Sequence, residues 1–516
     1  MLAECDMVLG ISENTINYQF EQLWKRKKIQ REWNILIDSN EVLINPDSKT
    51  FDDKIDNEQF DVAFKAKIDA PTIKILKNDS KILNFFITFK SGTMYSWEGN
   101  GKNAKVKTSS MENWIYAFKV AIGNIEKDAN NVNWITDESR EYFFVISKFI
   151  GLPVELFSIE SIFLDFENSN YSDYSTEESK INLSITELAY FQSLLSNAFK
   201  HIKNSDNPYI LGYGLKLKKY ENQEKAFFQP TTLRHTTTYD ANPNLSSFNF
   251  LMMIDNKKFP DGQAVGVLNK TIIKSEGNEI SGALALNNTV LTEKLFLPLI
   301  EIMEQTIVNI DKKFKSAKFD KNGNNSWVLN SSYTEREEKK RLESKYGYKY
   351  DWPGYNSKKS LEINFSVSNY QNSGGIKLDY SAVVNAEIDY DEDINFGKHI
   401  EEESEAMLSV LFTMSKDGKI ETKVLKETNI EESKEAYALY PTNMPIYDLS
   451  SVFKSLKDIG DNIKSSLEDK ISSFSIGKVI FPLGDILMYK NMEFEFDEKS
   501  NSGALVLDAA YYQSTK

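Results

Sequence analysis

The chain has 516 residues, 41% of them hydrophobic and 12% aromatic, so it can bury a large core and is not globally disordered. Its 61 Lys and Arg against 76 Asp and Glu give a net charge of −15, which excludes a chain-wide basic surface for nucleic acid. The single cysteine, Cys5, and the three histidines, His201, His235 and His399, exclude disulfide frameworks, cysteine-based zinc sites and iron–sulfur clusters.

Four segments show the 3.6-residue periodicity of amphipathic helices. The first begins after Ser12, a suitable N-cap, and ends in the basic run 25–28, where cations favour the helix C-terminus. The third is apolar on almost every face, so we expect it to be deeply buried. The predicted helices cover residues 11–25, 185–203 (with Thr186 as N-cap), 292–316 (with Thr292 as N-cap) and 446–472.

Between these helices the hydrophobic period changes from 3.6 to 2, which predicts strands with one buried and one wet face. Such strands favour antiparallel sheets, and the helices are too few for a doubly wound parallel fold. We therefore predict an α+β fold. The predicted strands are 60–68, 86–90 (ended by Ser91-Gly92), 142–149, 209–217, 248–254, 361–368, 377–388, 408–413, 420–425, 492–496 and 504–507.

The order of elements suggests a weak duplication. A pair of long helices brackets a strand-rich region in each half, so we predict two related units, residues 1–225 and 226–516, joined within the polar stretch 221–245. A second polar stretch at about 317–359 reads as an insertion in the C-terminal unit, with a short solvated helix over 334–344.

The candidate motifs for catalysis or metal binding lack residues that the motifs require. An EF-hand loop starting in the acidic run 389–393 would need Gly and Glu where Ile394 and Ile400 stand, so a solvated acidic turn is expected there. The alternating polar residues of 320–324 fail the same test, and 99–102 lacks the spacing of a phosphate loop. A His–carboxylate base stays open on sequence grounds, but we expect ordinary histidines, no catalytic residue, no cofactor and no metal.

The helical apolar faces are more informative. If a helix stands off the sheet it covers, the slot between them would suit an acyl chain, since each buried CH₂ contributes about 0.8 kcal/mol. Simple packing of helix on sheet is the competing interpretation of the same residues. The candidate lipid-binding residues are Leu188, Phe191, Leu195 and Phe199 on one helix and Leu456 and Ile463 on another.

Three short stretches resemble a known family. Residues 6–17 (DMVLGISENTIN) lead into the first helix, 282–286 (GALAL) followed by 295–299 (LFLPL) form a strand-to-helix passage, and 481–491 (FPLGDILMYKN) form a closing strand. Together they resemble TULIP-superfamily proteins of the OrfX type, which are encoded in clostridial, botulinum-like neurotoxin gene clusters. None of the three stretches is a catalytic signature.

The resemblance implies highly curved antiparallel sheets wrapped around long helices, and a non-enzymatic protein that binds lipid or another apolar ligand and assists a co-encoded toxin. The alternative is a structural interaction component of a toxin complex, with a closed core and no lipid. Other proteins of the toxin cluster are the expected partners, with no nucleic acid and no transmembrane segment. Without a signal peptide we expect synthesis in the cytoplasm, and the resemblance leaves open release from the cell with a toxin.

Overall fold

The computed structural model describes most of the chain. For some residues of the helices and strands, only the backbone is described. The described residues are 2, 4–39, 41–99, 101–171, 173–202, 206–219, 227–260, 268, 271–274, 280–314, 317–343, 346–352, 354–370, 374–394, 397–416, 419–433, 450–474, 478–484, 487–497 and 502–511.

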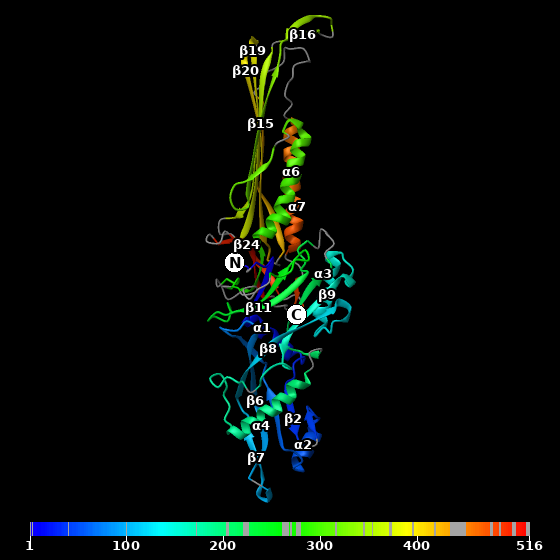
Figure 1. Cartoon of the computed structure of the whole chain (residues 1–516), viewed down its shortest axis with the longest axis vertical. Helices are drawn as coiled ribbons and strands as arrows, with labels where there is room; N and C mark the ends of the chain where they lie inside the picture. The colour runs from blue at the N-terminus through cyan, green and yellow to red at the C-terminus, as the bar shows by residue number, and fades with distance from the viewer. Residues whose placement is uncertain are drawn as a thin grey trace. The chain divides into compact units, whose positions relative to one another are not determined.

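The protein is α+β, and the strand pairings described are antiparallel, as the alternating pattern predicts (Figure 1). By compactness the chain divides into two units. Unit 1 contains Met1–Leu286, Ser475–Met488 and Val506–Lys516, and unit 2 contains Asn287–Phe474 and Tyr489–Leu505. This division does not test whether the predicted halves 1–225 and 226–516 are structurally related. Their relatedness stays a prediction.

A ten-stranded sheet dominates unit 1. Its main path is β22-β10-β9-β8-β6-β4-β2-β3, and β5 and β7 also pair with β6. Its strands are β2 (Glu32–Ile37), β3 (Val42–Ile44), β4 (Val62–Ile68), β5 (Thr72–Ile75), β6 (Ile82–Glu98), β7 (Lys105–Ser110), β8 (Trp114–Asp128), β9 (Phe157–Asp165), β10 (Ile210–Leu217) and β22 (Val479–Ile480). The helices of unit 1 are α1 (Glu13–Lys25), α2 (Ser48–Asp56), α3 (Asp137–Ile150) and α4 (Ile185–His201).

A six-stranded sheet has the order β11-β12-β1-β13-β24-β23. Its central strand β1 pairs on both sides, with Gly10 opposite Asn249 on β12 and Ala283 on β13. The strands are β1 (Met7–Ser12), β11 (Thr232–Thr238), β12 (Ser247–Met253), β13 (Ile280–Asn287), β23 (Leu487–Asp497) and β24 (Ser502–Tyr511).

Unit 2 is built on a second six-stranded sheet, β14-β15-β18-β19-β20-β21, and a two-stranded sheet of β16 and β17. Helices α6 and α7 run side by side, and α7 contacts β19, β20 and β21 (Figure 1). The strands are β14 (Phe319–Lys321), β15 (Ser326–Glu337), β16 (Lys340–Glu343), β17 (Lys349–Trp352), β18 (Tyr355–Asn369), β19 (Gly375–Ile394), β20 (Gly397–Met414) and β21 (Ile420–Ser433). The helices are α5 (Asn288–Leu291), a π-helical turn (Thr292–Phe296), α6 (Leu297–Ile310) and α7 (Ser450–Phe474).

Local capping explains where the first and second predicted helices begin. Ser12 caps α1 as predicted, and its Oγ accepts a hydrogen bond from the Thr15 backbone N–H at 3.1 Å. The predicted cap of α4 is wrong, because Ser184 rather than Thr186 holds that position. Ser184 and Glu187 form a reciprocal capping box, in which the Glu187 N–H donates to Ser184 Oγ at 3.3 Å and the Ser184 N–H donates to Glu187 Oε2 at 2.9 Å.

Several predicted elements are wrong. Residues 142–149 belong to helix α3, capped by Thr136, rather than to a strand. Residues 334–337 lie in β15 and residues 340–343 lie in β16, rather than in a helix. Strand β6 continues through Ser91-Gly92, where the glycine lets β4 approach closely, since a Cβ at Gly92 would lie only 2.7 Å from the Ala66 Cβ. The third helix is not buried on every face, since Ile302 is 56% exposed.

Candidate functional site

The predicted lipid-binding face of α4 packs against its sheet. Phe191, Leu195 and Phe199 are fully buried, and Leu188 is half-buried near the start of the helix. Helix α4 contacts strands β2, β3 and β4. The structure therefore brings these four residues onto the sheet side of one helix, as the periodicity predicts.

Aromatic rings fill the space beneath α4 around Phe199. Its ring stacks on Phe166 with centroids 4.4 Å apart and on Tyr171 at 5.4 Å. Trp33 meets it edge-on at 5.3 Å, and Phe118 lies tilted at 5.4 Å. Such distances are those of directly contacting rings, so no acyl-chain-wide slot separates Phe199 from the residues below it.

Phe191 is enclosed in the same way. Its ring lies 5.3 Å from Tyr116, 5.6 Å from Phe89 and 5.8 Å from Trp114, each in an edge-on arrangement. The Tyr116 hydroxyl is hydrogen-bonded to the backbone oxygen of Tyr171 at 2.5 Å, which satisfies the buried polar group. The region under α4 is thus a packed aromatic core.

Sequence reasoning found the helix side of this core but missed its other wall. Phe166 and Tyr171 lie between β9 and α4, outside the alternating strands, so periodicity gave no signal for them. Phe85 and Phe118 pair directly across β6 and β8, and that cross-strand register becomes visible only in the folded sheet. The high aromatic content was the available signal.

The second predicted groove lies beneath α7 in unit 2. Ile463 is 2% exposed, whereas the Leu456 side chain lies outside the described residues. A Cβ built at Gly460 would lie 3.3 Å from Tyr380 and 3.4 Å from Leu408, so helix and sheet approach closely here. The remaining cavity beside Gly460 has a volume of about 10 Å³, too small for an acyl chain.

The three histidines do not share a site. His201 is exposed at the end of α4. His235, on β11, stacks on Phe248 at 5.8 Å, and burial lowers its pKa to about 4. His399, exposed on β20, is hydrogen-bonded through Nδ1 to Asp389 at 2.8 Å, and that carboxylate raises the pKa of the imidazole.

The acidic run 389–393 lies within strand β19 rather than in the expected solvated turn. The carboxylate of Asp391 accepts two hydrogen bonds from the Arg336 guanidinium, at 2.5 and 2.6 Å. Asp389 is held by His399. Across the residues that the structure describes, no group of three or more His, Cys, Asp or Glu side chains could hold a metal ion.

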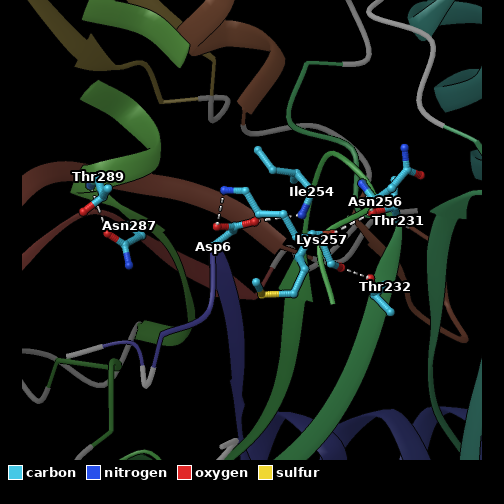
Figure 2. Close-up of polar contacts among 9 residues, drawn as sticks. Asp6, Thr231, Thr232, Ile254, Asn256, Lys257, Asn287 and Thr289 are labelled. Atoms are coloured by element: carbon cyan, nitrogen blue, oxygen red, sulfur yellow. Dashed lines mark hydrogen bonds and ion pairs between the residues drawn. The ribbon is translucent and has the colours of Figure 1, made fainter. Parts of the chain in front are cut away.

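The N-terminal stretch is tied down by polar contacts next to the only cysteine. The Asp6 carboxylate accepts hydrogen bonds from the Ile254 backbone N–H at 2.9 Å and from Lys257 Nζ at 3.2 Å (Figure 2). Thr232 donates its hydroxyl to the backbone oxygen of Lys257 at 2.6 Å. Beside Asp6, the buried Cys5 thiol has its pKa raised to about 12, chiefly by burial, which makes it a poor nucleophile.

Two surface pockets of unit 1 are lined without residues of α4. One, of about 490 Å³, is wide open over α1, with Asn14, Tyr18 and Trp24 in its wall. The other, of about 220 Å³, is more enclosed and includes Lys28, Lys127 and Trp134. Neither is an apolar tunnel. Among the described helices, none is both long enough and apolar enough to cross a membrane.

Neither a family model nor a curated protein matches the chain. Among solved structures, P47 from Clostridium botulinum A2 is similar, with 13% identity, a TM-score of 0.46, and 99% of this chain and 98% of that chain covered. P47 of Clostridium botulinum E1 gives 12% identity, a TM-score of 0.46, and 98% and 99% coverage. A lipopolysaccharide binding protein gives 8% identity, a TM-score of 0.26, and 99% and 100% coverage.

These likenesses by themselves assign neither a ligand nor an activity to the chain. Membership of the OrfX type stays a prediction.

Proposed function

We propose that this chain is a non-enzymatic interaction protein that assists a co-encoded protein toxin. Its cores are filled by side chains and hold no lipid. Of the two functions that the sequence left open, lipid carriage between helix and sheet and structural interaction within a toxin complex, the second fits the packing better. The observation that carries this choice is the aromatic cluster beneath α4, where Phe166 and Phe199 stack at 4.4 Å.

The toxin-related part of the proposal rests on the resemblance of residues 6–17, 282–286, 295–299 and 481–491 to OrfX-type proteins. On that basis the long antiparallel strands and the helices lying on them are those of a TULIP-like fold with highly curved sheets. The same resemblance makes proteins encoded beside this chain its first expected partners.

Lipid contact at the surface is a second candidate, favoured by a separate observation. Helix α3 exposes Phe144 (46%), Val145 (62%) and Phe149 (42%), while its opposite face is buried. Large exposed apolar side chains in one place are typical of surfaces that meet a partner or a lipid. On this view lipid would be held outside the core.

Co-expression with each protein encoded beside it tests the proposal. We expect a stable complex with at least one of them by size-exclusion chromatography and native mass spectrometry. A liposome flotation assay run in parallel tests the surface-lipid alternative. Failure to form any such complex, together with flotation on liposomes, would reject the interaction role in favour of lipid binding.

A further inference from the structure

The more enclosed pocket of unit 1 has the composition of a small-ligand site. Its volume is about 220 Å³, below the roughly 300–1,000 Å³ typical of drug-sized ligands, so only a small molecule fits. An indole, three isoleucines and six polar residues share its wall. The lining residues are Lys28, Ile125, Lys127, Asn133, Trp134, Ile135, Ser161, Asp206, Asn207 and Ile210.

The wall of this pocket is held rigidly from behind. Trp134 is packed on Phe143 at 5.6 Å and on Tyr213 at 4.8 Å, and the Ile135 backbone N–H donates to the Tyr213 hydroxyl at 3.0 Å. The buried Asn207 amide donates to the Leu164 backbone oxygen at 2.7 Å. A wall fixed by packing loses little conformational entropy when a ligand binds.

In the described part of the chain, the lysines that line the pocket are not paired with carboxylates. Among the residues that the structure describes, the ammonium groups of Lys28 and Lys127 make no ion pair, although the nearby Lys216 and Lys218 are each paired with a carboxylate. Asp206 Oδ1 accepts a hydrogen bond from the Asn133 amide at 2.8 Å. Two lysines against one carboxylate leave a net positive pocket on a chain of net charge −15.

We propose that this pocket binds a small polyhydroxylated anion, an acidic monosaccharide or a sugar phosphate. The two ammonium groups would receive the carboxylate or phosphate of the ligand through charge-assisted hydrogen bonds. The Ser161 hydroxyl and the Asp206 carboxylate offer partners to sugar hydroxyls, and the indole of Trp134 offers an apolar face to the ring. The site is independent of the interaction role proposed above.

Ligand-detected NMR and isothermal titration calorimetry on the full chain test the proposal, with glucuronate, glucose 6-phosphate, glucose and inorganic phosphate as probes. We expect glucuronate or glucose 6-phosphate to bind about ten-fold more tightly than glucose, which lacks the charge, and than phosphate, which lacks the ring. Lys28→Gln and Lys127→Gln should each weaken binding about ten-fold. Lys90→Gln, at an exposed lysine of β6 outside the pocket lining, is the matched control and should change nothing.

Three results would overturn the proposal. Absence of binding by both charged sugars at millimolar concentration would remove the site. Equal binding of phosphate and glucose 6-phosphate would reduce it to an anion site without sugar recognition. An equal effect of Lys90→Gln and Lys127→Gln would show a diffuse charge effect, and circular dichroism of each variant separates that outcome from misfolding.

Discussion

Truncation of Phe199 probes the closed core beneath α4 most sharply. The side chain is fully buried, with five aromatic neighbours: Trp33, Phe85, Phe118, Phe166 and Tyr171. Burial of about 150–250 Å² at about 25 cal/mol per Å² gives roughly 4–6 kcal/mol, and measured Phe→Ala losses in packed cores are about 3–5 kcal/mol. We therefore expect Phe199→Ala to lower the free energy of unfolding of unit 1 by about 4 kcal/mol.

Urea unfolding followed by tryptophan fluorescence measures this loss, because the ring of Trp33 lies 5.3 Å from that of Phe199. Phe144→Ala is the matched control, since Phe144 is 46% exposed on α3 and its loss should cost less than about 0.5 kcal/mol. A cost below about 1 kcal/mol for Phe199→Ala would contradict a closed core, because it would mean that the ring borders a space already open or occupied by an exchangeable ligand.

Three further changes test the electrostatics and capping of unit 1. Burial lowers the pKa of His235 to about 4, below its unfolded value of about 6.5. The free energy of unfolding should therefore be highest above pH 6.5 and fall by up to about 3 kcal/mol toward pH 4. In urea titrations, His235→Gln should show a smaller fall over the same pH range. Lys216→Met leaves the buried Glu160 carboxylate, which lies 3.0 Å from the Lys216 ammonium, without its cationic partner. This variant should lose about 3–5 kcal/mol of stability in thermal and urea unfolding, and the double variant Lys216→Met/Glu160→Gln should recover most of that loss. No recovery in the double variant would contradict the ion-pair explanation. Ser184→Ala removes the cap of α4 and should cost about 1 kcal/mol, whereas Ser184→Asp, which keeps an accepting oxygen, should cost little.

The sequence predicts the elements whose hydrophobic period is long and regular. Helices α1, α4 and α7 fall where a stripe of apolar residues runs for several turns, and the antiparallel sheets follow from the period of two. Helix α3 was mistaken for a strand because its segment 142–149 is dense in aromatic and β-branched residues, which suit either structure. Its cap Thr136 and the left-handed Gly151 at its C-terminus were the discriminating signals.

The candidate site was predicted on the helix side only. Phe191, Leu195 and Phe199 were identified by spacing, but whether they line a slot or a core depends on residues contributed by loops and distant strands, such as Phe166 and Trp33. That depends on register and loop path, which no local pattern encodes. The ligand-sized pocket of unit 1 was missed for the same reason, since Lys28, Lys127 and Trp134 come together only in the folded chain.

Native mass spectrometry of the full chain, purified without detergent or organic solvent, decides whether the core beneath α4 is closed. We expect a species at the mass of the bare chain, 59.2 kDa, with no extractable lipid released on denaturation. A stoichiometric species heavier by the mass of a lipid, lost on denaturation and absent from an otherwise stable Leu195→Phe variant, would contradict the closed core and restore lipid carriage beneath α4.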